Sequence, residues 1–471
     1  MLLALLLLAS PLEKLVLEAI RFPTYEKNAE AHAAQKAWLA QTAQGFGFMV
    51  RDAGTVTEIE LPGPAGAPVL GLVVHGDVQP VEASAWSVPP FAGVLRDGVI
   101  WGRGAADDKG PLVQALLAME SLKPLQRTHT VRLLVGTDEE SGSDDMKAYL
   151  KDHAPPDYSL VLDAAFPVVT GEKAWDGLAV VAPDDGPASG FRIGELTAGL
   201  APSIVPDVAR LVLLEPPAAL PAKLRARKLD RGTRADFREA PGTLEIAVHG
   251  RSAHSGMNPD AGRNALVSLA HLVHGLLPAC AAADLLDFAA YVGADPHARK
   301  LGLPGAPGWG GFIVNAATVA RKHPHFEKRD GQLSLIVNFR RPPPLSAAQS
   351  RERLFALVTG FSRRLIPDEY YFKDEPFVID PQGKLVQRLM DDYARATGKR
   401  EPPSISGGGT YAKRIPNAVA FGMWFPGKPY PGHDVDERVS VKDLERGLRV
   451  LKLTLADLAC GAPLHDPFKP L

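Results

Sequence analysis

Short apolar runs that each end in a polar cluster constrain the fold of this chain more than any other feature of its sequence. Four of these runs are predicted strands, at residues 69–74, 131–135, 159–162 and 418–424. A helix that opens at Gly110-Pro111 separates the first two runs, with Pro in the first turn, where it is tolerated. Short apolar strands that alternate with helices predict a mostly parallel α/β sheet.

The middle of the chain follows a different pattern. Residues 243–248 and 333–339 alternate between apolar and polar side chains, and residues 264–277 between them are predicted as a helix. At 471 residues the chain also exceeds the roughly 250–300 residues at which a single core stops growing. We therefore predict an α+β domain at 185–374, inserted into a discontinuous α/β domain formed by 10–184 and 375–471. The α/β pattern resumes with a helix predicted at 382–397.

Polar side chains occur just past the ends of the predicted strands. They are His75, Asp77, Asp107, Glu139, Glu140, Asp163 and His433. In open parallel sheets, ligand sites lie outside the carboxyl ends of the strands, so we expect these side chains to converge. Carboxylates gathered in one cleft raise one another's pKa unless cations neutralise them. Because imidazoles are mixed with the carboxylates, the set favours Zn²⁺ or a similar ion, with two ions sharing one carboxylate.

Taken one at a time, these residues are also compatible with roles that involve no ligand. A Glu-Glu pair such as Glu139-Glu140 is usually solvated, and Asp163 alone would be typical of a capped turn. Asp107 stands in a charged stretch ahead of a helix. Their order and their shared position at strand ends favour a common site.

Charge and cysteine content exclude several classes of protein. The 52 basic and 54 acidic residues give a net charge of −2, so the chain lacks the basic excess of a nucleic-acid-binding protein. No apolar run reaches the roughly 20 residues that a membrane span requires. Cys280 and Cys460, far apart and without a CxxC motif, exclude a disulfide scaffold and a thiolate metal site.

The N-terminal residues form a separate segment. Met1 to Ala9 is an aliphatic run, and Ser10-Pro11 with Glu13 predicts a capping box at the start of a helix. The run resembles the apolar core of a secretory signal, but no basic side chain precedes it and Leu7 stands where a small residue is expected. A signal remnant would place the protein in the periplasm or outside the cell; a packed helical extension would be compatible with the cytoplasm. Both alternatives stay open.

Several motifs resemble those of a known family. Residues 102–110 read GRGAADDKG, preceded by His75-Gly76-Asp77 and followed by residues 138–142, which read DEESG. Together they resemble the co-catalytic zinc peptidases related to carboxypeptidase G, aminoacylase and the dipeptidases. The DDKG variant, residues 163–167 (DAAFP) and residues 407–412 (GGGTYA) are most similar to the PepV-type Xaa-Xaa dipeptidases and the carnosinase branch.

The resemblance implies a role for each polar residue at the strand ends. One zinc ion would be bound by His75, Asp107 and Asp163, and the other by Asp107, Glu140 and His433, with Asp107 as the bridge. Asp77 would hydrogen-bond the His75 imidazole and fix its tautomer. Glu139 would be the general base that takes a proton from the metal-bridging water and passes it to the leaving amine. Mn²⁺ or Co²⁺ would be possible in place of zinc.

The resemblance also makes the α/β domain the catalytic domain and the insert a lid. Residues 250–255 (GRSAHS) resemble the lid motif whose histidine, here His254, would stabilise the oxyanion. Arg340, at the end of a lid strand, would bind the carboxylate of the substrate, although Arg341 beside it leaves the choice of arginine open. Backbone donors of Gly408, Gly409 and Thr410 would bind the same end of the substrate.

The expected activity is hydrolysis of dipeptides or short peptides with a free α-amino group. The family places Asp at the position of Asp163 in its aminopeptidase-like and dipeptidase-like members, and Glu in its carboxypeptidase-like and deacylase-like members. An N-acyl amino acid deacylase or a carboxypeptidase on the same scaffold is the alternative activity. A non-catalytic binding protein is disfavoured because all seven motif positions carry competent residues.

The length of the insert leads to an expectation about assembly. Smaller members of the family have a shorter lid and dimerise through it, so the oxyanion histidine comes from the partner chain. The insert at 185–374 is long enough for two such halves. We therefore predict an active monomer with a pseudo-dimeric lid, a small peptide substrate, and no nucleic-acid or membrane partner, with His254 acting within its own chain.

Overall fold

The computed structural model describes residues 10–26, 28–184, 190–321, 332–372 and 374–470. The aliphatic run Met1–Ala9, with its two alternatives, lies outside the described residues. None of the helices within the described ranges is long and apolar enough to cross a membrane. The capping box is present, because the side chain of Ser10 accepts the N–H of Glu13, whose carboxylate accepts the N–H of Ser10.

The chain forms two compact units, of which the first comprises Met1–Glu172 and Phe377–Leu471 and the second Lys173–Pro376. The insert expected at 185–374 falls within the second unit. This unit also contains the strand β10, Ala174–Ala182, because β10 pairs with strands of the insert.

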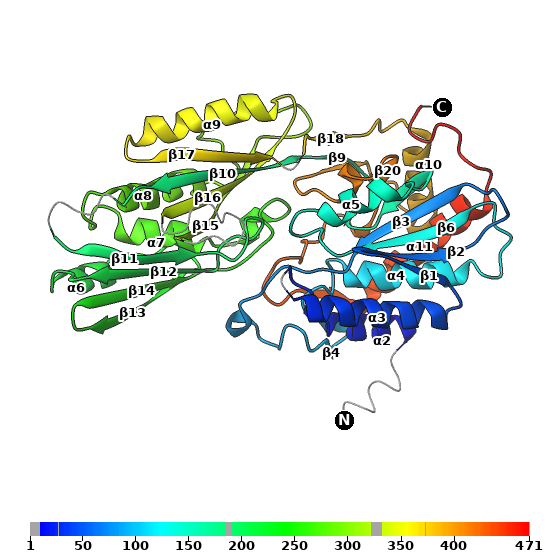
Figure 1. Cartoon of the computed structure of the whole chain (residues 1–471), viewed down its shortest axis with the longest axis horizontal. Coiled ribbons are helices and arrows are strands. Elements are labelled where there is room, and N and C mark those ends of the chain that lie inside the picture. Colours follow the sequence, from blue (N-terminus) through cyan, green and yellow to red (C-terminus); the bar gives the residue numbers. More distant parts are fainter. Residues whose placement is uncertain (1–9, 27, 185–189, 322–331, 373, 471) are drawn as a thin grey trace. The chain divides into compact units, whose positions relative to one another are not determined.

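The first unit is built on a nine-stranded sheet (Figure 1). In spatial order its strands are β1 (Met49–Ala53), β2 (Val56–Leu61), β6 (Thr130–Gly136), β3 (Val69–His75), β7 (Tyr158–Val161), β20 (Ala418–Ala420), β9 (Val169–Glu172) and β18 (Phe377–Val378), with β19 (Ser404–Ser406) beside β9. The four central strands, β6, β3, β7 and β20, are parallel to their neighbours in this group, whereas β1, β2 and β18 pair antiparallel. The predicted α/β class is confirmed.

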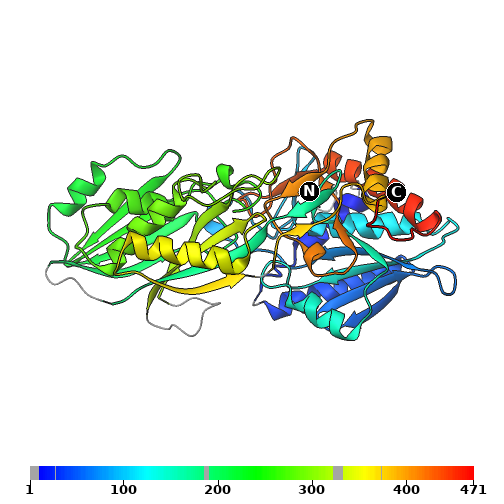
Figure 2. The ribbon, with the colours of Figure 1, turned by 90° about the horizontal axis from the view of Figure 1, so that it is seen from above.

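Helices cover both faces of this sheet (Figures 1 and 2). They are α2 (Pro11–Ile20), α3 (Ala29–Gly45), α4 (Lys109–Ser121), α5 (Asp144–Asp152), α10 (Lys384–Thr397) and α11 (Val441–Cys460). On one face, Leu72 and Val74 of β3 share a core with α2, α4 and α11; on the other, Val73 packs in a smaller cluster with Met146 and Tyr149 of α5. Alternate side chains of a strand point to opposite faces, so this central strand is apolar from Val69 to Val74, before His75.

The strand predicted at 418–424 is wrong in its extent. It is divided into β20 and β21 (Met423–Trp424), which pairs with β8 (Ala164–Ala165). Gly422 separates them with φ +71°, and a Cβ there would lie 2.6 Å from the ring of Phe166. The break cannot be seen in the sequence, because residues 418–424 are apolar throughout. They are apolar because they are buried, whether or not they pair in a sheet. A third sheet joins β4 (Val94–Arg96), β5 (Val99–Trp101) and β22 (Arg438–Ser440).

The second unit is an α+β domain, and its described strands pair antiparallel. Its sheet runs β13 (Arg234–Ala240), β14 (Thr243–His249), β12 (Val208–Leu214), β11 (Arg192–Ala198), β15 (Ile313–Ala320), β16 (Leu333–Arg341), β10 and β17 (Ile366–Phe372). The helices α6 (Leu220–Arg225), α7 (Ala265–Val273), α8 (Ala281–Gly293) and α9 (Ala347–Phe361) share one hydrophobic core with it. The helix predicted to reach residue 277 ends at Val273, because Gly275 adopts φ +68°. Short 3₁₀ turns occur at Ala83–Ala85, Pro259–Ala261 and Tyr411–Lys413.

Candidate metal centre

The polar residues expected at the strand ends are brought together in the first unit. His75 ends β3, Glu139 and Glu140 follow β6, and Asp163 follows β7. The remaining members come from loops: Asp77 follows β3, Asp107 precedes α4, and His433 precedes β22. The carboxyl ends of parallel strands meet at one edge of the sheet, which explains why residues so distant in sequence become neighbours.

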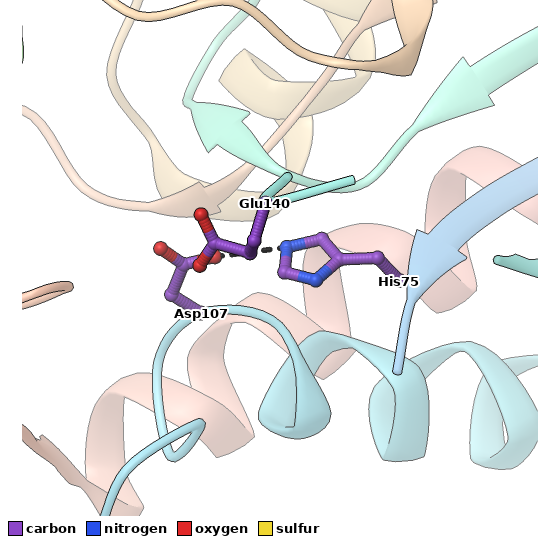
Figure 3. Close-up of side chains that lie close together, drawn as sticks. All are labelled: His75, Asp107 and Glu140. Atoms are coloured by element: carbon purple, nitrogen blue, oxygen red, sulfur yellow. Dashed lines mark hydrogen bonds and ion pairs between the residues drawn. The ribbon is translucent and has the colours of Figure 1, made fainter. Parts of the chain in front are cut away.

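The carboxylate of Asp107 lies between two imidazole rings. Its Oδ1 is 2.9 Å from Nε2 of His75, a contact visible in Figure 3, and its Oδ2 is 3.3 Å from Nε2 of His433. All three side chains are buried. A carboxylate whose two oxygens face different imidazoles has the arrangement of a ligand that bridges two cations.

Further carboxylates lie beside both imidazoles. On one side, Oδ2 of Asp163 is 3.9 Å from Nε2 of His75; on the other, Glu140 is 3.0 Å from Nε2 of His433. The potential ligand atoms of His75, Asp107 and Glu140 lie within 4.8 Å of one another, as do those of His75, Glu139 and Asp163. These sets of imidazole and carboxylate donors fit zinc and similar divalent ions.

The electrostatics of the cluster also favour a cation. Burial and the negative charges of Asp107 and Asp108 raise the pKa of Asp163 well above its ordinary value. Burial alone would lower the pKa of His433, but the charge of Glu140 and the hydrogen bond to Asp107 raise it to about 10. Buried carboxylates at this density need positive charge nearby, and a divalent ion would supply it.

Asp77 fixes the loop that carries both glutamates. Its Oδ1 accepts the N–H of Glu139 at 3.2 Å and its Oδ2 accepts the N–H of Glu140 at 3.0 Å. Its backbone carbonyl is 3.0 Å from Nδ1 of His75, whereas its carboxylate is 3.4 Å from the same atom. A proton on Nδ1 leaves the lone pair of Nε2 for a cation, so Asp77 holds the imidazole in the tautomer that a ligand needs.

Asp145, a residue that sequence reasoning missed, supports the same loop from α5. Its carboxylate accepts the N–H of Thr137 at 2.7 Å, the N–H of Asp138 at 3.1 Å and the hydroxyl of Tyr411 at 2.5 Å. Acidic residues are common in the first turn of a helix, so the sequence carries no signal that sets this one apart.

Glu437 is a second missed residue, and it holds the loop of Asp107. Its buried carboxylate accepts N–H groups from Gly104, Ala106 and Asp107, and it pairs with Arg103 at 2.8 Å. Glu437 stands four residues after His433, so the two loops that carry metal-ligand candidates are tied to each other. An acidic residue close to a ligand histidine was the signal available in the sequence.

His254 lies in the second unit, between β14 and α7, and is largely buried. Its Nδ1 accepts two backbone N–H groups, from Gly256 at 2.9 Å and Met257 at 3.0 Å. Because a nitrogen that accepts these bonds carries no proton, the neutral ring has its proton on Nε2. The predicted oxyanion donor therefore has the required tautomer.

The two adjacent arginines of β16 have different surroundings. Arg341 is fully buried and pairs with Asp176 at 2.7 Å and with Glu375 at 2.6 Å. Arg340, also in the second unit, approaches the hydroxyl of Ser203 at 3.4 Å. The two carboxylates that engage Arg341 make it less available for a substrate carboxylate, the role predicted for Arg340. That role stays a prediction.

The glycine-rich loop at 407–412 belongs to the first unit. The N–H and the hydroxyl of Thr410 donate to the buried carboxylate of Glu172, at 3.1 and 2.8 Å. The N–H of Gly408 donates to the hydroxyl of Ser406 at 2.9 Å, and a Cβ on Gly409 would lie 3.1 Å from the Lys413 side chain. The loop is thus held by its own neighbours, and its role toward a substrate stays a prediction.

Comparisons with known proteins bear on the family and the fold of the chain. The model of peptidase family M20/M25/M40 matches residues 71–457. YtjP of Bacillus subtilis, provisionally named a dipeptidase, is 28% identical over 403 residues, 84% of each chain. The Beta-Ala-Xaa dipeptidase of Lactobacillus delbrueckii subsp. lactis is 27% identical over 386 residues, 81% of this chain and 80% of that protein. The solved structure of the di-peptidase Dug1p from Saccharomyces cerevisiae shares the fold, with a TM-score of 0.57, 12% identity, and coverage of 94% of this chain and 95% of its own.

Proposed function

The chain belongs to peptidase family M20/M25/M40 and is a metallopeptidase, and from this premise we propose that it is a dinuclear zinc enzyme that hydrolyses dipeptides or short peptides with a free α-amino group. The observation that carries the proposal is the carboxylate of Asp107, whose two oxygens face two different imidazoles. His75 and Asp163 would complete the site of one ion, and Glu140 and His433 that of the other. Mn²⁺ or Co²⁺ would serve the same donor set.

Glu139 is the proposed general base. When bound, the two ions would lower the pKa of the attacking water and polarise the scissile carbonyl. The carboxylate of Glu139 would take the proton of that water and pass it to the leaving amine. The carboxylate of Asp77 accepts the backbone N–H groups of Glu139 and Glu140 and so fixes their positions. One glutamate can then serve as a ligand and its neighbour as the base.

Two residues of the second unit would act on the substrate. His254 would donate its Nε2–H to the oxyanion of the tetrahedral intermediate, and the two bonds to its Nδ1 support this tautomer. Arg340 would bind the carboxylate of the substrate. In the loop of Gly408, Gly409 and Thr410, the proposed backbone donor is Gly409, because the N–H groups of Gly408 and Thr410 donate to Ser406 and Glu172. These assignments follow from the family resemblance.

The substrate class rests on Asp163 and on the relatives. Asp at this position is typical of family members that act on a free α-amino group, and two relatives similar to this chain carry dipeptidase names. The test compares hydrolysis of free dipeptides with that of their N-acetyl forms. Preference for the free dipeptide supports the proposal; preference for the N-acetyl form would instead identify a deacylase.

Metal dependence is tested in the same assay. Prolonged chelation, verified by elemental analysis, should abolish hydrolysis, and Zn²⁺, Mn²⁺ or Co²⁺ should restore it. Asp107→Ala should lose both ions because it removes the shared ligand. Full activity in metal-free protein, or two ions retained by Asp107→Ala, would overturn the two-metal proposal.

A further inference from the structure

Tyr430 reaches the candidate metal centre from the loop that carries His433, but sequence reasoning did not associate this tyrosine with the centre. It lies between β21 and His433, flanked by Pro429 and Pro431, and its side chain is buried. Its ring packs on Trp424 with 4.4 Å between ring centroids. Its hydroxyl donates a hydrogen bond to Oδ2 of Asp107.

The loop leaves space for this contact at Gly432. A Cβ at that position would lie 2.2 Å from the hydroxyl oxygen of Tyr430 and 2.8 Å from Oδ2 of Asp107. Both distances are too short for a carbon atom. Any other residue at position 432 would therefore push the phenol and the carboxylate apart. Glycine is needed here for space, since its φ is not in the left-handed region.

The phenol binds the particular oxygen of the bridge that faces His433. Oδ2 of Asp107 is 3.3 Å from Nε2 of His433, whereas Oδ1 contacts His75. A carboxylate oxygen has two lone pairs, so it can accept the phenol hydrogen and still bind a cation. Such a bond from a neighbouring group fixes the rotation of the ligand and is a recurring feature of metal sites.

We propose that Tyr430 is a positioning residue that holds the carboxylate of Asp107 across the two halves of the centre and sets the affinity of the His433 side for its cation. The inference rests on the proposed function, since it assumes that Asp107 is the shared ligand. It adds a residue that the family resemblance did not single out. Tyr430 acts through Asp107, and no contact with substrate is assigned to it.

The test is a titration of metal-free protein with Zn²⁺ alone, in competition with a chromophoric chelator. Tyr430→Phe keeps the ring and its packing on Trp424 but removes the hydroxyl. It should bind one of two ions about 10–100-fold more weakly, the usual effect of removing a hydrogen bond to a metal ligand. Tyr158→Phe is the control, because it removes another buried hydroxyl of the first unit, one bonded to His129. It should bind both ions as the unchanged protein does.

Two further variants test whether the phenol acts on the His433 side of the centre. Gly432→Ala retains the phenol but displaces it, so it should weaken the same ion. In a His433→Ala background, Tyr430→Phe should reduce Zn²⁺ affinity little further. The ion site that Tyr430 supports is already weakened by the loss of His433. Unchanged affinity in both Tyr430→Phe and Gly432→Ala, or a full additional loss in the His433→Ala background, would overturn the inference. Failure of the unchanged protein to bind two ions would instead refute the proposed function.

Discussion

At the scale of single residues, Glu139 and Glu140 are adjacent but have different neighbours. Glu140 contacts His433 and the amide of Gln79, both at 3.0 Å. Glu139 lies with His75 and Asp163 in a second group of potential ligands. The two glutamates thus belong to different groups that share His75, and the proposed mechanism gives them different roles.

We predict that Glu139→Gln retains both ions and binds substrate, while kcat falls at least about 10²–10⁴-fold, the contribution of general base catalysis. KM should change little, because the lost interaction forms only in the transition state. Glu140→Gln should lose occupancy at one metal site. The measurement is metal stoichiometry beside kcat for both variants. Loss of a metal by Glu139→Gln with two ions retained by Glu140→Gln would reverse the assignment.

Asp392 permits a prediction about pH that is independent of the metal centre. Its side chain is buried on α10, and burial raises its pKa to about 6, although Arg395 partly offsets this effect. The folded state therefore holds the proton more tightly than the unfolded chain, whose Asp has a pKa of about 3.9. The free energy of unfolding should then fall as the pH rises from about 4 to about 6.

Asp392→Asn should remove this loss, so its stability relative to the unchanged protein should increase by about 1–3 kcal/mol across that pH range. Thermal unfolding at several pH values measures the difference. Asp391→Asn is the matched control, because Asp391 is the preceding residue of the helix and is exposed. A difference between Asp392→Asn and the unchanged protein that stays constant with pH would contradict the assignment.

At the scale of elements, the sequence predicts strands and helices well where apolar periodicity is continuous. The strand expected at 69–74 is β3, Val69–His75, and the helix expected at 382–397 is α10, Lys384–Thr397. His75, Glu140 and Asp163 could be predicted for the same reason, since each stands at or just after the end of such a run. Asp107 and His433 lie in loops, and the family resemblance assigned them. The apolar pattern did not predict the break between β20 and β21 at Gly422. This glycine lies close to the ring of Phe166, a residue distant in sequence, and local periodicity does not report such a contact.

The supporting residues could not be predicted from local pattern. Glu437 contacts residues that are more than 300 positions away in sequence, and Tyr430 reaches Asp107 across a similar separation. These partners become neighbours only when the whole sheet has formed. The sequence around His433 contains Tyr430 and Glu437, but it does not indicate which residues their side chains contact.

Glu437→Gln should destabilise the loop of Asp107, because an amide can place an N–H donor against the backbone donors that a carboxylate accepts. An unsatisfied buried donor costs about 1–3 kcal/mol. The variant should therefore unfold at lower denaturant concentration and bind metal more weakly. Glu445→Gln, an exposed glutamate on α11, is the control and should match the unchanged protein. Identical metal affinity in the two variants would show that Glu437 does not position the ligand loop.

At the scale of the whole molecule, the sheet of the second unit consists of two four-stranded halves. One half is β13, β14, β12 and β11, and the other is β15, β16, β10 and β17. Within the described residues, Ala198 with Val319 is the single residue pair that joins β11 to β15, whereas β12 and β14 pair at seven positions. A narrow junction between two halves supports the expectation of a pseudo-dimeric lid.

We therefore propose that the active form is a monomer and that His254 serves the metal centre of its own chain. The prediction is tested by mixing two inactive variants, Glu139→Gln and His254→Ala. One variant keeps His254 and the other keeps Glu139. If the histidine came from the partner chain, a mixed dimer would contain one active site with both groups, and activity would return. An enzyme that uses its own histidine would stay inactive, because each chain still lacks one group. Size-exclusion chromatography with light scattering, at the assay concentration, provides the independent measurement of mass. Recovered activity together with a dimeric mass would show that the histidine is donated between chains, and the two halves of the sheet would then need another explanation.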